Sequence, residues 1–145
     1  APYEEMAYDW IDLVNTTPEY GAGALGVLKE PVDFMSFLRQ VKSEFGATIK
    51  YTKPIKDLVK TVAVCGGSGS FLLDAAKRAN ADVLITSDFK YHDYFDADNS
   101  ICILDIGHYE SERFTIDLIT ERLSKKFPKF AVLKTEVNTN PIQYY

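Results

Sequence analysis

The chain has 145 residues with 46% hydrophobic side chains, 26% charged side chains and a formal net charge of −5, a composition typical of one soluble globular domain. No stretch approaches the roughly 18 consecutive apolar residues of a membrane span, and the first residues do not resemble a signal peptide. The negative charge argues against nucleic acid as a partner, because duplex binding draws its affinity mainly from Lys and Arg on phosphates.

The amino-terminal part of the sequence predicts a strand, a loop, a helix and a second short strand. Residues 5–14 alternate in polarity and carry aromatic and β-branched side chains, which favours a strand. Residues 15–26 are rich in glycine and predict a loop or the tip of a hairpin. The pattern over residues 31–45 predicts an amphipathic helix that ends at Gly46, and residues 48–52 predict a short strand.

From residue 60 onward, short apolar runs alternate with helical patterns. The expected strands are residues 60–65, 82–86, 101–106 and 130–135, and the expected helices are residues 70–80, 90–97 and 109–127. Continuous apolar runs of this length are typical of parallel strands covered on both faces. The predicted fold class is therefore α/β, with a mostly parallel sheet flanked by helices and a surface extension after Glu136.

Both cysteines of the chain fall within these apolar runs or at their ends. Cys65 closes the run at residues 60–65, and Cys102 lies within residues 101–106. A free cysteine in a buried strand behaves as a small hydrophobic residue, so we expect two reduced core cysteines in a cytoplasmic protein. The alternative is a disulfide between them.

The most specific pattern follows the expected strand at residues 101–106. Gly107 is followed by His108, and Glu112 lies four residues further along the predicted helix. Side chains at positions i and i+4 share a helix face, so this imidazole and this carboxylate point at a common centre. The donor pair suits zinc, manganese, iron or nickel, although two ligands do not complete a site. The alternative is a solvated ion pair on the helix surface.

The other histidine also follows an expected strand. Asp88 ends the apolar run, and His92 lies four residues later. Ligand crevices of open α/β sheets lie beyond the carboxyl ends of the strands, so His92 is a candidate acid/base or supporting residue beside the metal. The alternative is an N-cap aspartate with a partly buried histidine that is satisfied by a carbonyl group.

A glycine cluster, residues 66–70, follows the expected strand at residues 60–65. It lacks the Lys-Ser/Thr of a Walker loop and does not match the G-x-G-x-x-G pattern, so a phosphate loop is only weakly indicated. One interpretation is a tight turn in which Ser68 or Ser70 caps the next helix. The other is an open approach for a substrate or a metal-bound water.

Three segments carry a resemblance to a known family. They resemble the carboxyl-terminal half of the NGG-interacting factor 3-like family, often labelled GTP cyclohydrolase 1 type 2 homologues, and they are residues 61–70, 81–93 and 104–112. Residues 2–9 resemble the end of a domain, similar to the PII-like signalling fold, that many bacterial members carry in mid-chain. The resemblance implies that residues 1–22 are a remnant of this inserted domain and that residues 23–145 are the carboxyl-terminal α/β half. We therefore expect a fragment of a longer protein.

The resemblance also implies a dinuclear metal site shared between two halves of that longer protein. The family's carboxyl-terminal half supplies a histidine and a glutamate that match His108 and Glu112, and its amino-terminal half supplies two histidines and an aspartate. The second group is not in this sequence, so we expect this chain alone to bind metal poorly. Ser87 and Ile106 replace a Gly and an Ala that the family tends to have, which leaves the ligands in place.

Two functions of different classes are left open by the sequence. The first is a metal-dependent hydrolase of a nucleotide or related heterocycle, with metal-bound water as nucleophile and His92 as proton carrier. The second is a metal-binding scaffold or regulatory protein that acts through protein partners and a ring-shaped homo-oligomer, which the resemblance implies. Both place His108, Glu112 and His92 in one pocket beside residues 66–68, and neither involves nucleic acid or a membrane.

Overall fold

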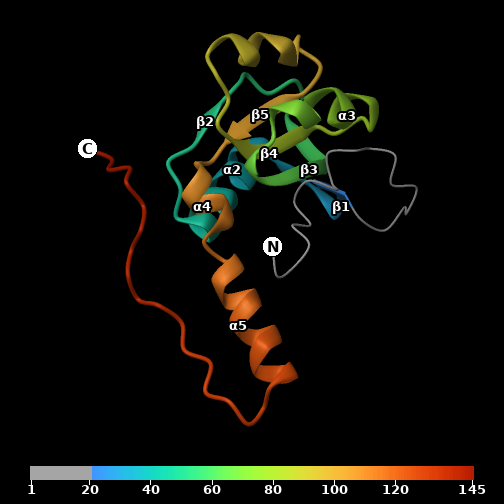
Figure 1. Cartoon of the computed structure of the whole chain (residues 1–145). Helices are drawn as coiled ribbons and strands as arrows, with labels where there is room; N and C mark the ends of the chain where they lie inside the picture. Colours follow the sequence, from blue (N-terminus) through green and yellow to red (C-terminus); the bar gives the residue numbers. More distant parts are fainter. Residues whose placement is uncertain (1–20) are drawn as a thin grey trace.

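The computed structural model describes residues 21–145, so the strand expected at residues 5–14 and most of the remnant expected at residues 1–22 lie outside the described residues. The described part forms a five-stranded sheet of order β1-β3-β4-β5-β2 (Figure 1). Its strands are β1 (Ala24–Asp33), β2 (Lys50–Tyr51), β3 (Leu58–Ser68), β4 (Val83–Ser87) and β5 (Cys102–Asp105). The central three strands are parallel, and β1 and β2 pair antiparallel at the two edges.

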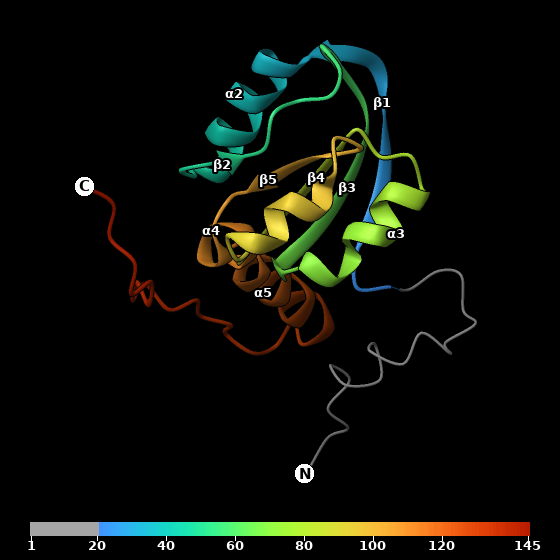
Figure 2. The same ribbon diagram turned by 90° about the horizontal axis from the view of Figure 1, so that it is seen from above.

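Helices cover both faces of this sheet, which confirms the predicted α/β class. The helices of the described residues are α2 (Phe34–Phe45), α3 (Leu73–Arg78), α4 (His108–Glu112) and α5 (Thr115–Lys126), with 3-10 turns η1 (Ser70–Leu72) and η2 (His92–Ala97). Figure 2 shows α2 on one face of the sheet and α3 on the other. The helix α5 extends away from the α/β body, and the carboxyl-terminal segment runs back from its end (Figure 1).

The two faces of the sheet build two separate cores, because successive residues of a strand point to opposite sides. On β4, Val83 and Ile85 pack in the cluster that includes Phe34 of α2. Leu84 lies between them in sequence and packs in the cluster that includes Leu73 of α3. This two-sided burial is what the continuous apolar runs predict. Packing on both faces holds the carboxyl ends of the parallel strands in place.

The start of the first helix differs from the prediction. Residues 31–33 belong to the edge strand β1, where Val32 and Asp33 pair with β3. Residues 24–26 of the predicted loop also belong to β1, and residues 15–20 of it lie outside the described residues. Pro31 is tolerated because an edge strand does not need every backbone N–H. The helix begins instead at Phe34. Asp33 is its N-cap, because the Asp33 carboxylate accepts a hydrogen bond from the backbone N–H of Ser36 at 2.9 Å.

Three other predicted elements are also corrected. The helix predicted over residues 109–127 is divided into α4 and α5, and that predicted over residues 90–97 is the 3-10 turn η2. Among the described residues, 130–135 form no strand. Strand β5 is flanked by β4 and β2, so it offers this segment no free edge. The periodicity of a local segment carries no information about which sheet edges are taken.

The two cysteines are buried and unpaired, as predicted. Cys65 lies on β3 and Cys102 lies on β5, and neither forms a disulfide. Burial raises the pKa of the Cys102 thiol to about 11, so this side chain stays a neutral core residue at physiological pH. None of the helices in the described part of the chain is long and apolar enough to cross a membrane.

Candidate metal centre

The candidate site lies where the three parallel strands end at one edge of the sheet. Gly67 is next to the last residue of β3, Asp88 follows β4 directly, and His108 begins α4 after β5. Parallel strands place their carboxyl ends side by side, so residues far apart in the sequence meet here. This edge is where the sequence predicts a ligand crevice.

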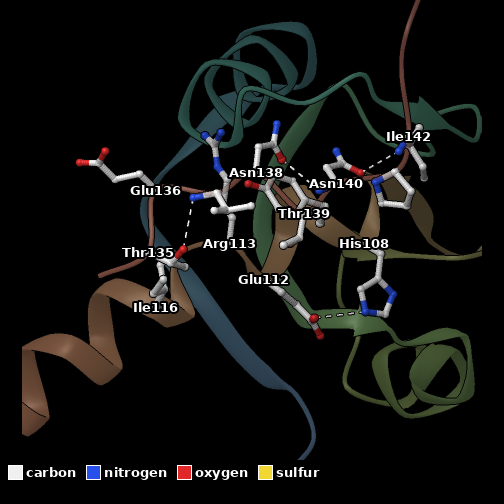
Figure 3. A pocket seen from close by; sticks show the side chains of 13 residues that line it. His108, Glu112, Arg113, Ile116, Thr135, Glu136, Asn138, Thr139, Asn140 and Ile142 are labelled. Atoms are coloured by element: carbon white, nitrogen blue, oxygen red, sulfur yellow. Dashed lines mark hydrogen bonds and ion pairs between the residues drawn. The ribbon is translucent and has the colours of Figure 1, made fainter. Parts of the chain in front are cut away.

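The imidazole of His108 lies between two carboxylates. Its Nε2 atom is 3.1 Å from Oε2 of Glu112, and its Nδ1 atom is 2.6 Å from Oδ2 of Asp88. The first contact follows from the i,i+4 spacing on α4 that the sequence indicates, and Figure 3 shows these two side chains joined. All three side chains are about half exposed, at 48% for His108 and Asp88 and 49% for Glu112.

Gly67 brings the backbone of β3 against this pair. Its φ of +66° lies in the left-handed region, and a Cβ atom at this position would overlap Oε1 of Glu112 and lie 3.2 Å from Cε1 of His108. The Gly67 N–H donates to Oγ of Ser111 at 2.8 Å, and its carbonyl accepts from Oγ1 of Thr86 at 3.0 Å. Glycine at this position therefore lets His108 and Glu112 keep their place beside the strand.

The predicted capping role of the glycine cluster is wrong. The turn η1 begins after Gly69, and no side chain caps it, so neither Ser68 nor Ser70 acts as the expected N-cap. The cluster instead continues β3 as far as Ser68 and carries it past the candidate ligands. The other interpretation, an open approach for a substrate or a metal-bound water, stays a prediction.

Asp88 is the site residue that the sequence analysis did not identify. Its place after a strand suggests a helix N-cap, whereas its carboxylate contacts His108 across the sheet edge. Its backbone has a φ of +60°, a left-handed conformation in which aspartate is several-fold enriched over most residues. The available signal was an acidic side chain directly after a buried strand, the position at which parallel sheets gather ligand-binding groups.

The structure places His92 outside this arrangement. His92 is the exposed first residue of η2, and its ring lies edge-on to Tyr91 with 5.4 Å between the ring centroids. It is not among the described side chains that line the pocket beside His108 and Glu112. The expected convergence of three residues thus holds for two of them, and a role of His92 in proton transfer stays a prediction.

A pocket of about 690 Å³ adjoins the His108 and Glu112 pair. Its walls are Arg113 and Ile116 on one side and residues 135–142 of the carboxyl-terminal segment on the other (Figure 3). One hydrogen bond connects this segment to α4, since Nδ2 of Asn140 donates to the buried carboxylate of Glu110 at 3.4 Å. The candidate ligands therefore border a space that is lined by apolar side chains together with amide, hydroxyl and guanidinium groups.

The two carboxylates raise the pKa of His108 above its ordinary value of 6.5. The hydrogen bond that the ring donates to Asp88 is the largest cause, and Glu112 adds to it, whereas partial burial acts in the opposite direction. A raised pKa in the folded chain means that the protonated ring stabilises the fold. That contribution is complete below about pH 6.5 and disappears as the pH rises through the raised pKa.

We expect a corresponding pH dependence of metal binding, because a metal ion competes with a proton for Nε2 of His108. Zinc affinity should rise with pH until the raised pKa of His108 is passed, and Asp88→Asn should move this rise to lower pH. Zinc titrations at a series of pH values test the expectation. A pH profile that Asp88→Asn leaves unchanged would show that Asp88 does not set the protonation of His108.

The donor set fits a divalent metal ion. His108 presents an imidazole nitrogen and Glu112 a carboxylate oxygen at a common point, and this combination suits zinc and the neighbouring transition metals. Asp88 contacts the other ring nitrogen, as the outer partner of a metal-bound histidine commonly does. The remaining coordination positions are left to water or to groups beyond these two ligands.

Comparisons with known proteins find relatives along nearly the whole chain. The family model Duf34/NIF3 (NGG1p interacting factor 3) matches residues 3–141. Proteins named GTP cyclohydrolase 1 type 2 homolog are similar over 99% of this chain, at 32% identity in Staphylococcus epidermidis and 33% in Bacillus subtilis. The chain spans 40% of the length of these curated relatives.

Solved structures show the same fold. Staphylococcus aureus protein SA1388 is 26% identical with a TM-score of 0.73, and the match covers 87% of this chain and 43% of that protein. A Bacillus cereus protein related to NIF3 is 27% identical with a TM-score of 0.72, covering 86% of this chain and 36% of the other.

Proposed function

Because the chain belongs to the Duf34/NIF3 (NGG1p interacting factor 3) family, we propose that it supplies half of a dinuclear metal site. The observation that carries this proposal is the 3.1 Å approach of His108 Nε2 to the Glu112 carboxylate at the carboxyl edge of the parallel sheet. The position of Gly67 against both side chains supports it, since a larger residue there would displace them. Zinc, manganese, iron and nickel are the metals that suit this pair of donors.

The proposed activity is hydrolysis of a nucleotide or related heterocycle. A bound divalent ion would supply Lewis-acid activation of water for such a reaction. The pocket beside the ligands is lined by Arg113, Asn138 and Asn140, whose side chains can bind the polar edge of a heterocycle or its phosphate. The names of the Staphylococcus epidermidis and Bacillus subtilis relatives support a nucleotide as the substrate class.

A second candidate function is a metal-binding scaffold or regulatory protein that acts as a homo-oligomer and through partners. The observation in its favour is α5, which buries no side chain within the described residues. Its apolar side chains Leu118 and Ile119 are about half exposed, at 50% and 51%. A helix with such a surface fits assembly with further copies or with other polypeptides better than it fits an isolated surface helix.

Release of formate or phosphate from GTP in the presence of zinc or manganese tests the proposed activity. The assay uses a polypeptide that contains this chain and has the full length of the curated relatives. We expect turnover that depends on added metal and that His108→Ala and Glu112→Gln each lower by several orders of magnitude, whereas His92→Ala tests the proton-carrier prediction separately. A metal-loaded protein without turnover on GTP would contradict this substrate and favour the scaffold function.

A further inference from the structure

We propose that Asp88 is the positioning residue of this metal centre. Its carboxylate holds the proton of His108 on Nδ1, so that Nε2 presents its lone pair to the metal. This inference rests on the proposed function, and it concerns a residue of this chain that is not itself one of the proposed ligands. Three observations carry it: the partners of the two ring nitrogens, the backbone of Asp88, and the exposure of the pair.

The two nitrogens of the His108 ring have different partners. Nδ1 lies 2.6 Å from Oδ2 of Asp88, and Nε2 lies 3.1 Å from Oε2 of Glu112. An ionised carboxylate can only accept a hydrogen bond, so the nitrogen that contacts Asp88 is a donor. When the ring is neutral it carries one proton, and the shorter contact places that proton on Nδ1. Nε2 then has a free lone pair beside the Glu112 carboxylate, where a divalent cation would bind.

The backbone of Asp88 holds this carboxylate at a fixed point. Asp88 follows Ser87 of β4, which is fully buried and pairs with Ser68 of β3. At Asp88 itself the chain takes a left-handed turn with a φ of +60°, a conformation that aspartate tolerates and most residues do not. The side chain is thus directed from the end of a rigid strand, and the ring that it contacts begins helix α4.

The exposure of the Asp88 and His108 side chains indicates that their contact positions the ring and adds little to the stability of the fold. The side chains of Asp88 and His108 are each 48% exposed. Pairs as exposed as this contribute little to the stability of a fold, because water and salt screen them. Loss of the Asp88 carboxylate should therefore change the state of the His108 ring and the affinity for metal, with little effect on the folded population.

The chain has two histidines, so ring-nitrogen NMR resolves the question directly. In the metal-free 145-residue chain labelled with ¹⁵N, at a pH where the ring of His108 is neutral, we expect His108 as the Nδ1–H tautomer. Asp88→Ala should convert it to a mixture of both tautomers. Asp88→Asn should retain much of the Nδ1–H form, because the amide oxygen still accepts a hydrogen bond. His92 provides an internal reference in every spectrum.

Zinc titration of the same samples tests the consequence for binding. Removal of an outer partner of a ligating histidine commonly lowers metal affinity about 10- to 100-fold, and we expect this loss for Asp88→Ala with a smaller loss for Asp88→Asn. Asp98→Ala is the matched control, because Asp98 also adopts a left-handed backbone, with a φ of +46°, and lies at the end of η2. It should leave both the tautomer of His108 and the zinc affinity unchanged.

The outcomes separate this inference from the proposed function. A wild-type His108 in the Nε2–H form, or an Asp88→Ala chain with unchanged tautomer and affinity, overturns the positioning role of Asp88. Absence of zinc binding by a polypeptide that contains this chain and has the full length of the curated relatives would overturn the proposed metal function, whereas the tautomer of His108 still reports whether Asp88 positions the ring. A tautomer change together with a 10- to 100-fold loss of zinc affinity, absent from Asp98→Ala, establishes the role.

Discussion

Replacement of His108 by alanine is expected to reduce zinc binding by this chain below detection. His108 provides one of only two proposed ligands, so its loss leaves the Glu112 carboxylate as a single ligand at a half-exposed position. One carboxylate in such a site competes poorly with water for a divalent ion. Competition with a chromophoric zinc indicator measures the affinity even where it is weak.

The matched control for this substitution is His92→Ala. It removes the other histidine of the chain from an exposed turn outside the pocket, so it should leave zinc affinity unchanged. Zinc binding that survives in His108→Ala would show that the ligands are elsewhere in the molecule. A loss of affinity in His92→Ala would place His92 at the metal after all, as the sequence pattern allows.

The zinc affinity of the wild-type chain indicates whether one copy of the chain forms the whole binding site. Two protein ligands leave several coordination positions to water, so the chain alone should bind zinc weakly. Tight, stoichiometric binding that His108→Ala removes would mean that copies of the chain complete the site together. Light scattering with and without zinc distinguishes these cases, and the exposed apolar face of α5 provides a surface for such assembly.

The central strands and the pair of His108 and Glu112 can be predicted from the sequence for the same physical reason. Strands β4 and β5 are covered on both faces, so residues 83–85 and 102–104 form continuous apolar runs, which are visible without tertiary information. His108 and Glu112 are neighbours on one helix, so their spacing alone predicts their contact. Both inferences depend only on residues that are close in the sequence.

The features that the sequence did not reveal depend on contacts between distant segments. Asp88 meets His108 across the carboxyl ends of two strands, and no local spacing connects them. The edge strand β1 includes Pro31 and an irregular register between Val27 and Val32, so it lacks the regular alternation by which a strand is recognised. The segment 130–135 has a strand-like composition, but it cannot pair beside β5, because β4 and β2 take both sides of that strand.

Substitution of Gly67 by alanine is expected to disrupt the metal centre from the side of β3, which faces His108 and Glu112. The new Cβ would overlap Oε1 of Glu112 and crowd Cε1 of His108 at 3.2 Å, so both ligands must move. The left-handed backbone at Gly67, with a φ of +66°, adds about 1–2 kcal/mol of strain for a residue with a side chain. We expect a melting temperature lower by a few degrees and zinc affinity reduced towards that of His108→Ala.

Gly66→Ala separates this effect from a general intolerance of the glycine cluster. A Cβ at Gly66 would lie 3.7 Å from Cγ of Glu112, which is ordinary van der Waals contact, and its backbone is outside the left-handed region. The same added methyl group should therefore leave zinc affinity and melting temperature close to the wild-type values. Equal losses in both variants would mean that the cluster acts through chain flexibility, whereas a loss confined to Gly67→Ala would show that close approach of β3 to His108 and Glu112 shapes the site.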